Sequence, residues 1–382
     1  MNRAGQLIQN LSGELSYKSF KPNPLPPNPP LQISSSMVKK LVEANRALVR
    51  LDSASSLIPN ASLFVSMYVR KEALISSQIE GTQCTLDDVL DPELDTNVNL
   101  DVGDVVNYVN AVDYAIERLK TLPLCNRLLK EIHAKLMEGV RGSDKTPGEF
   151  RKSQNWIGGA NCALKDARYI PPNVEDMQDS MDALEKYLNE GDDYDSLVRI
   201  ALIHYQFETI HPFLDGNGRV GRLLILIYLL QTGILHQPVI YISYFLKKNQ
   251  VEYYDRISEV RRSGNYEQWV EFFLEAVEEA ANDSLLTIQK LVKLHDTNIE
   301  KLPKSNRAKD NLRAIFDYIE QYPIIDIKRT AKALSLSYNT VASCVKKLEE
   351  LSILKETTNA LRNKVYSYFD YMEILRKDVE TR

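Results

Sequence analysis

One short stretch, residues 211–222, constrains this chain more than any other part of the sequence. It reads His-Pro-Phe-Leu-Asp-Gly-Asn-Gly-Arg-Val-Gly-Arg, and an apolar run over residues 223–230 follows it directly. The run is long enough for one buried helix. Gly216, Asn217 and Gly218 stand where that helix would begin, and these residue types tolerate unusual backbone angles. We therefore expect backbone N–H groups at the positive end of the helix to form a phosphate-binding concavity.

Charged and titratable side chains surround the expected concavity. Arg219 and Arg222 are three residues apart and share one helical face, where two guanidinium groups can clamp the outer phosphates of a nucleotide. Asp215 is a candidate ligand for the Mg²⁺ that accompanies such phosphates. His211 is a candidate to take a proton from an incoming hydroxyl. Each residue type is common in structural roles, but their co-occurrence favours a catalytic site.

The stretch resembles the signature of the Fic (filamentation induced by cAMP) family, His-Pro-Phe-x-Asp/Glu-Gly-Asn-Gly-Arg-x-x-Arg, and every specified position is present. The resemblance implies a helical enzyme that transfers AMP from ATP to a Ser, Thr or Tyr hydroxyl of a target protein or of itself. It implies that His211 is the general base and that Asp215 binds Mg²⁺. It also implies that the α- and β-phosphates are held by Gly216, Asn217 and Gly218.

A second segment resembles the Ser/Thr-x-x-x-Glu-Gly/Asn inhibitory motif of the same family. Ser76 and Glu80 are four residues apart near the end of a predicted helix, and Gly81 is the expected C-terminal stop. On its own, a glutamate near a helix end is usually solvated. By the resemblance, Arg219 neutralises phosphate charge, and Arg222 either grips the γ-phosphate of ATP or is held by Glu80. The motif lies N-terminal to the catalytic stretch, which resembles the class II arrangement of autoinhibited Fic proteins.

Two further regions carry candidate binding residues. Residues 153–159 and 167–172 predict two short strands joined by a loop. This hairpin resembles the Fic flap, which receives the target protein as an added strand. The candidate target-docking residues are Asn155, Trp156, Ile157, Gly158 and Gly159. Tyr253 and Tyr254 stand in a place comparable to that of tyrosines that approach the adenine in Fic proteins.

Apolar residues at helical spacing run through most of the remaining chain, which predicts an all-α fold with a small β-hairpin flap. We predict three parts. Residues 1–99 form an N-terminal helical region with a proline-rich arm and the inhibitory helix, residues 100–299 form the Fic catalytic domain, and residues 305–382 form a winged helix-turn-helix domain. His133 and His204 lie within predicted helices, and we interpret both as structural residues.

The C-terminal part has its own charge balance. Residues 301–382 carry 16 Lys and Arg against 11 Asp and Glu, whereas the whole chain has a net charge of −5. The third helix of this part would offer a DNA groove the side chains of Tyr338, Asn339, Thr340, Ser343, Lys346 and Lys347. A basic loop, Arg362-Asn363-Lys364, precedes an expected strand. However, three glutamates nearby (Glu349, Glu350 and Glu356) would repel phosphates, and winged helices also mediate protein contacts. Either DNA or a protein is therefore a possible partner.

The composition is that of a soluble globular protein, with 26% charged and 44% hydrophobic residues. The four cysteines are widely spaced and form no Cys-x-x-Cys pair, which indicates neither a zinc site nor a disulfide framework. The N-terminus lacks an apolar signal region, and no apolar run reaches the roughly 20 residues of a membrane span. We expect a cytoplasmic protein without membrane contact, for which a homodimer is one possible state.

The sequence leaves several functions open. The intact motif argues against phosphorylation and phosphocholination, which tend to accompany altered motifs in the family. Removal of AMP, with Glu80 placing a water molecule, would use the same residues as its addition. A different class of function is a DNA-binding regulator whose Fic core only senses ATP. His211 argues against that class, because a sensor needs no general base.

Overall fold

The computed structural model describes residues 2–56, 61–90, 100–139, 144–159, 162–303, 307–358 and 364–377. No helix in this described part is long and apolar enough to cross a membrane. The chain forms two compact units. The first comprises residues 1–49, 107–236 and 245–281, and the second comprises residues 50–106, 237–244 and 282–382. The predicted domain boundaries at residues 99 and 305 lie outside the described residues, and the predicted division stays a prediction.

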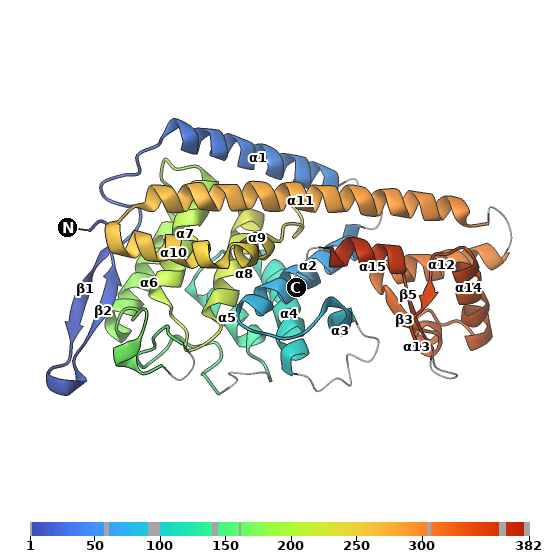
Figure 1. Cartoon of the computed structure of the whole chain (residues 1–382), viewed down its shortest axis with the longest axis horizontal. Helices are drawn as coiled ribbons and strands as arrows, with labels where there is room; N and C mark the ends of the chain where they lie inside the picture. The colour runs from blue at the N-terminus through green and yellow to red at the C-terminus, as the bar shows by residue number, and fades with distance from the viewer. Residues whose placement is uncertain are drawn as a thin grey trace. The chain divides into compact units, whose positions relative to one another are not determined.

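The first unit is a helical assembly that carries the stretch at residues 211–222 (Figure 1). Its complete helices are α5 (Asn126–Leu136), α6 (Val174–Asn189), α7 (Ser196–Ile210), α8 (Asn217–Gln231) and α10 (Gln250–Ser263). It also contains the short 3-10 helices η1 (Gly13–Leu15) and η3 (Leu164–Asp166), and parts of α1 (Ser35–Ser55), α4 (Leu100–Leu119), α9 (Ile242–Lys248) and α11 (Tyr266–Lys301). The mostly helical fold agrees with the sequence prediction.

Helices α7 and α8 form the centre of this unit. Residues 197–210 of α7 and residues 219–229 of α8 are all buried, so the apolar run at residues 223–230 is a core helix as predicted. The two helices approach closely at Gly221. A Cβ atom there would lie 3.2 Å from the Phe207 ring and would overlap the Glu208 carboxylate. This glycine therefore lets α8 pack directly against the end of α7.

The N-terminus forms a β-hairpin that the sequence analysis did not predict. Strands β1 (Gly5–Asn10) and β2 (Tyr17–Pro22) pair antiparallel, with Leu7 opposite Phe20 (Figure 1). Beyond the hairpin, residues 23–34 of the proline-rich arm form no helix or strand, and the chain bends at residues 25–26 and 28–29. A proline residue has no backbone N–H group to donate, but its carbonyl oxygen can still accept a hydrogen bond. In this arm, two proline carbonyls accept from a side chain that lies far away in the sequence.

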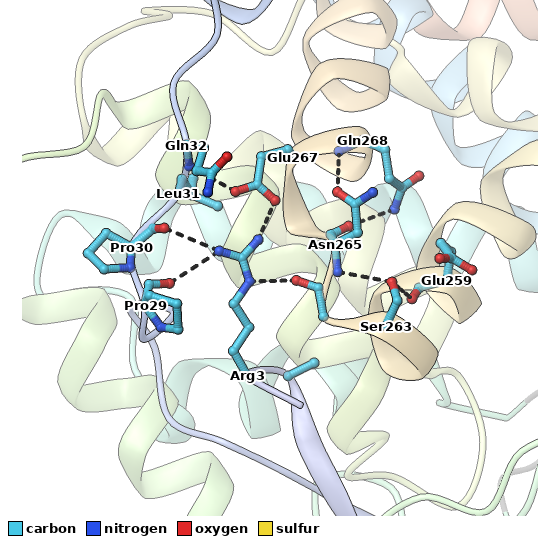
Figure 2. A network of polar contacts seen from close by, with 12 residues as sticks. Arg3, Pro29, Pro30, Leu31, Gln32, Glu259, Ser263, Asn265, Glu267 and Gln268 are labelled. Carbon is cyan, nitrogen blue, oxygen red and sulfur yellow. Dashed lines mark hydrogen bonds and ion pairs between the residues drawn. The ribbon is translucent and has the colours of Figure 1, made fainter. Parts of the chain in front are cut away.

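That side chain is Arg3, which fastens the arm to the turn between α10 and α11 (Figure 2). Its Nε donates to the Gly264 carbonyl at 2.6 Å, and its Nη1 donates to the carbonyls of Pro29 and Pro30, each at 3.2 Å. Its Nη2 forms an ion pair with Glu267. One partly buried guanidinium thus joins the N-terminus, the proline-rich arm and the start of α11.

The flap contains less strand structure than predicted. Instead of two strands, the described residues show one isolated antiparallel bridge between Ile157 and Tyr169, with N–H···O distances of 2.8 and 3.1 Å. The physical reason is that Pro171 and Pro172 lack the N–H groups that would continue the ladder. The flap is supported from β2 instead, because the Phe20 N–H donates to the Ile170 carbonyl at 3.0 Å.

The second unit contains α2 (Ala61–Ile79), α3 (Leu86–Leu90) and the C-terminal elements (Figure 1). These are α12 (Arg307–Gln321), β3 (Ile324–Asp326), α13 (Ile327–Ala333), α14 (Tyr338–Glu350), β4 (Lys355–Glu356), β5 (Val365–Ser367) and α15 (Phe369–Arg376). The three strands form an antiparallel sheet in the order β3-β5-β4. Helix α12 packs on α2, and Arg376 forms an ion pair with Asp87 of α3 at 2.6 Å. The predicted loop residues Arg362 and Asn363 lie outside the described residues.

Candidate active site

The loop between α7 and α8 begins at His211, which has a left-handed backbone with φ 52° and ψ 61°. Its N–H donates to the Phe207 carbonyl at 2.9 Å and so ends α7. This conformation costs a residue with a side chain roughly 1–2 kcal/mol. Such strain persists only where the surroundings over-determine the backbone, and it is common at functional sites. The contacts that hold the His211 backbone therefore define the site.

Two side chains next to the flap hold this backbone in place. The buried Arg151 donates from Nε to the His211 carbonyl at 3.0 Å, and its N–H donates to the Pro212 carbonyl at 2.9 Å. The Asn155 amide donates to the carbonyls of His211 and Phe213 at 3.1 and 2.9 Å. Burial lowers the pKa of Arg151 to about 10, so it stays charged at neutral pH. Asn155, predicted to dock the target, thus braces the loop between α7 and α8.

His133 of α5 supports the same loop from another direction. Its Nδ1 accepts from the Gly148 N–H at 2.9 Å, so its Nε2 carries the proton and donates to the Asp215 carbonyl at 3.1 Å. Its ring stacks on Phe213 with centroids 3.8 Å apart. Burial lowers the pKa of His133 to about 4 and keeps the ring neutral. His133 therefore has a structural role, as predicted, and that role is to hold the loop at Phe213 and Asp215.

Helix α8 begins at a glycine with a left-handed backbone, Gly216, with φ 74° and ψ 4°. A Cβ atom there would lie 3.0 Å from Met137 Sδ, so the position requires glycine. The Asn217 side chain accepts from the Phe213 N–H and donates to the Phe213 carbonyl, each at 2.8 Å. The side-chain amide of Asn217 therefore shapes the loop. Its backbone N–H lies in the first turn of α8, together with that of Gly218.

Two arginines occupy the first two turns of α8. Arg219 is 5% exposed and Arg222 is 1% exposed, and Nη2 of Arg219 contacts Met137 Sδ at 3.5 Å. Two buried guanidinium groups near the positive end of a helix concentrate positive charge where an anion is best stabilised. Both arginines that we predicted to bind phosphate therefore lie on α8, directly after the loop that begins at His211.

Asp215 is exposed, and its Oδ1 accepts from the Gly216 N–H at 2.6 Å. The described residues contain no group of three or more His, Cys, Asp or Glu side chains that could hold a metal ion. A single carboxylate suits Mg²⁺ that arrives with a nucleotide, because phosphates and water supply its other ligands. The residues present therefore fit a metal bound jointly by Asp215 and substrate phosphates.

The candidate adenine-binding tyrosines lie on α10. His204 donates from Nδ1 to the Gly221 carbonyl at 2.9 Å, so its Nε2 accepts from the Tyr253 hydroxyl at 2.9 Å. Tyr253 is 1% exposed, and Tyr254 is half-buried with its ring 5.0 Å from that of Tyr253. Tyr253 is thus a core residue that His204 orients. The adenine contact stays a prediction for both tyrosines.

The remaining predicted residues lie in the flap and in α2. Trp156 is 41% exposed, and its Nε1 donates to the Cys162 carbonyl at 2.8 Å. Gly158 and Gly159 are exposed, and Ile157 forms the flap bridge. In α2, Ser76 is fully buried and Glu80 is exposed just beyond the helix end. Gly81 has φ 95° and follows the last turn, as a C-terminal stop should. The pairing of Glu80 with Arg222 stays a prediction.

An open groove of about 900 Å³ lies along α10, but its described lining includes none of the predicted site residues. Three basic side chains (Lys247, Lys248 and Arg256) and three acidic ones (Glu252, Asp255 and Glu259) line it, so it offers no net charge to a phosphate. We place the candidate site at the α7–α8 loop because N–H groups and guanidinium groups converge there.

The two buried histidines predict a loss of stability in mild acid. Burial lowers the pKa of His133 to about 4 and that of His204 to about 3, from 6.5 in the unfolded chain. Below pH 6.5, protons bind these histidines more strongly in the unfolded chain than in the folded chain. Each histidine therefore lowers the free energy of unfolding at pH 5 by about 2 kcal/mol relative to neutral pH. Glu320 raises the pKa of His295, which acts in the opposite direction.

Urea unfolding at pH 7 and pH 5 measures this effect. We expect the His204→Phe variant to lose less stability between the two pH values than the wild type does. His236→Phe, at an exposed histidine, is the matched control and should keep the full pH dependence. A His204→Phe variant with the wild-type pH dependence would contradict the burial argument.

Comparison with known proteins identifies the family. The Fic/DOC family N-terminal model matches residues 38–117, and the Fic/DOC family model matches residues 123–229, which include the α7–α8 loop. The chain belongs to the Fic/DOC family. Among solved structures, a Fic family protein from Desulfovibrio desulfuricans G20 has a TM-score of 0.57 at 20% identity and covers 88% of this chain and 97% of that one. A Fic domain containing signaling protein from Bacteroides thetaiotaomicron has a TM-score of 0.52 at 18% identity, covering 66% and 97%. Both share the Fic fold.

Curated relatives carry the name protein adenylyltransferase Fic. The one from Aedes aegypti is 32% identical over 150 residues, which cover 39% of this chain and 26% of that protein. The one from Culex quinquefasciatus is also 32% identical, over 152 residues that cover 39% of this chain and 27% of that protein. The matched part therefore spans about a quarter of each relative, and it includes less than half of this Fic chain.

Proposed function

We propose that this Fic chain is a protein adenylyltransferase, which transfers AMP from Mg-ATP to a Ser, Thr or Tyr hydroxyl of a target protein or of itself. The observation that carries the proposal is the braced loop from His211 to Gly216 at the start of α8, with Arg219 and Arg222 buried in the same helix. The names of the curated relatives support the same activity.

The reaction requires one bond to form and one to break at the α-phosphorus. The oxygen of the target hydroxyl attacks this phosphorus, the bond to the β-phosphate oxygen breaks, and pyrophosphate leaves. We propose that His211 takes the hydroxyl proton during the attack. The first-turn N–H groups of α8 and the Arg219 guanidinium stabilise the charge that develops on the phosphate oxygens. Bound Mg²⁺ would neutralise charge on the leaving phosphates, with Asp215 holding it.

Two details of the loop refine the family's expected roles. The side-chain oxygen and nitrogen of Asn217 are both hydrogen-bonded to the backbone of Phe213. We therefore propose that Asn217 contacts phosphate through its backbone N–H. The backbone of Gly216 and Gly218 can approach a phosphate closely because these residues have no side chain. Tyr254 is the better candidate to meet the adenine, since Tyr253 is fixed in the core by His204.

The inhibitory role of Glu80 is part of the proposal. A carboxylate and the γ-phosphate of ATP compete for one guanidinium, that of Arg222. Ser76 is buried in the last turns of α2, and Gly81, with its left-handed backbone, follows the end of the helix. The enzyme would then be slow until Glu80 is displaced.

The flap and the C-terminal elements complete the proposed organisation. We propose that the target adds as a strand beside the exposed flap residues around Ile157, with Trp156 as an apolar contact. We also propose that residues 307–376 form a winged helix domain. Their order of helix, strand, two helices and two strands supports this assignment.

Replacing Asp215 by Asn is expected to raise the Mg²⁺ concentration needed for half-maximal AMP transfer roughly tenfold, because one charged ligand is lost. A titration of Mg²⁺ at fixed ATP measures this shift. Asp179→Asn, at an exposed aspartate of α6, is the matched control. An Asp215→Asn variant with the wild-type requirement would remove the metal role from this residue.

Mass spectrometry of the purified chain after incubation with Mg-ATP tests the activity itself. AMP on a Ser, Thr or Tyr side chain is the expected product, and fragment spectra distinguish it from a single phosphate. A phosphorylated product would instead show that the γ-phosphate is the transferred group.

A further inference from the structure

The segment from α13 through α14 has an unusual charge pattern. Residues 327–348 contain five basic residues and no acidic residue, although the chain as a whole is acidic with a net charge of −5. The basic residues are Lys328, Arg329, Lys332, Lys346 and Lys347. Such a local surplus in an acidic protein indicates an anionic partner for this surface.

The burial pattern of α14 separates a buried face from an exposed one. Val341, Val345 and Leu348 are at most 1% exposed and pack the helix into the C-terminal elements. Asn339 and Ser343 are exposed on the other side, four residues apart and so one helical turn from each other. The outward face therefore carries short polar groups that can donate and accept hydrogen bonds.

The start of α14 is well ordered by its cap. The Ser337 hydroxyl accepts from the Thr340 N–H at 3.1 Å, so Ser337 is the N-cap of α14. Ser335, in the turn before it, has a left-handed backbone with φ 54°, and the Leu336 N–H closes the turn on the Ala331 carbonyl at 2.9 Å. These contacts fix the direction of α14 relative to α13. Tyr338, in the first turn of α14, is 57% exposed.

Three of the nearby acids have partners close to them in the sequence, whereas the half-buried Glu349 forms no salt bridge in the described part of the chain. Asp326 caps α13 by accepting from the Arg329 N–H at 2.9 Å. Glu350 pairs with Lys347 at 2.9 Å, and Glu356 pairs with Lys364 at 2.7 Å. In the described part of the chain, the exposed residues Lys328, Lys332 and Lys346 take part in no salt bridge. The net positive charge of the surface therefore rests on these three lysines.

We propose that the exposed face of α14, flanked by the lysines of α13, binds duplex DNA in its major groove. A helix with its side chains is about 10–12 Å across and the groove is about 12 Å wide, so α14 fits. Lys328, Lys332 and Lys346 contact phosphates, while Asn339 and Ser343 reach base edges. The partner is identified by charge complementarity together with the polar character of the face. This binding goes beyond AMP transfer and does not depend on it.

The test uses the full chain and a fluorescent pool of 30-base-pair duplexes with randomised sequence. Lys332→Gln/Lys346→Gln should weaken binding at least roughly tenfold and reduce the slope of log affinity against log salt by roughly 2, one for each lost phosphate contact. Lys290→Gln/Lys293→Gln removes the same charge from exposed positions of α11 and should leave binding unchanged. Equal thermal midpoints show that both variants fold.

Sequence selection from the same pool tests the groove contact separately. A sequence enriched by the wild type should lose roughly tenfold in affinity with Asn339→Ala, while binding to unrelated duplexes changes little. No binding of any duplex at low salt would overturn the proposal, as would equal weakening by the α11 control. Preferential binding of a single-stranded RNA pool of the same length would also overturn it, because the partner would then be RNA.

Discussion

Replacing His211 is expected to reduce AMP transfer by about 10²- to 10⁴-fold, the contribution of a well-placed general base. His211→Asn is the sharpest form of this experiment. Asparagine tolerates the left-handed backbone that the structure shows at this position, with φ 52°, but it cannot accept the hydroxyl proton. A loss of activity in this variant therefore reports chemistry and not a collapsed loop.

His236→Asn is the matched control for this prediction, because it changes an exposed histidine beyond the end of α8. ATP binding should survive in His211→Asn, since the N–H groups and arginines of α8 remain. Initial rates of transfer from labelled ATP, together with the dissociation constant for ATP, separate the two effects. A His211→Asn variant within threefold of the wild type, on the roughly hundredfold scale of general-base effects, would remove the assigned role.

Replacing Glu80 by Gly is expected to raise AMP transfer roughly 5- to 150-fold, the usual range for coupling between two competing sites. In the proposed mechanism, this substitution removes the carboxylate that competes with the γ-phosphate for Arg222. The substitution should leave α2 stable, because the helix ends at Ile79 and a negative charge at that end opposes the helix dipole. Glu80→Gln should activate as well, since the competition is between charges.

Arg222 provides the test of this mechanism. In an Arg222→Ala background the gain from Glu80→Gly should vanish, because the contested guanidinium is absent. Transfer rates of the wild type, both single variants and the double variant form a complete cycle. Equal activation with and without Arg222 would show that Glu80 acts by another route.

The conformation of the loop between α7 and α8 could be predicted from sequence because the residues that determine it are close together in the chain. The glycines and Asn217 indicated a tight turn before a helix, and the structure shows Gly216 with a left-handed backbone there. The spacing of Arg219 and Arg222 placed both on α8. In each case the informative residues are close together in the chain, so their pattern can be recognised without knowledge of the fold.

The residues that brace the loop escaped prediction because their contacts are distant in sequence. Arg151 reaches the His211 carbonyl 60 residues away, and His133 reaches the Asp215 carbonyl 82 residues away. A helical histidine and a lone arginine carry no local sign of such a partner. Only the tautomer of His133, set by the Gly148 N–H, shows that it donates to the loop.

The small β-elements were the least predictable part of the fold. The β1–β2 hairpin has no strict alternation of apolar and polar residues, and Arg3 fastens it to a carbonyl 261 residues away. The flap was predicted as two strands, but prolines limit it to one bridge between Ile157 and Tyr169. In both places long-range contacts decide the outcome.

Labelled ATP and the Glu80→Gly variant together test whether this chain transfers AMP with His211 as the base. Glu80→Gly is incubated with Mg²⁺ and ATP labelled at either the α- or the γ-phosphate, beside Glu80→Gly/His211→Asn. Protein-bound label should come from the α-position alone and disappear in the double variant. Label from the γ-position, or α-label that persists without His211, would contradict it.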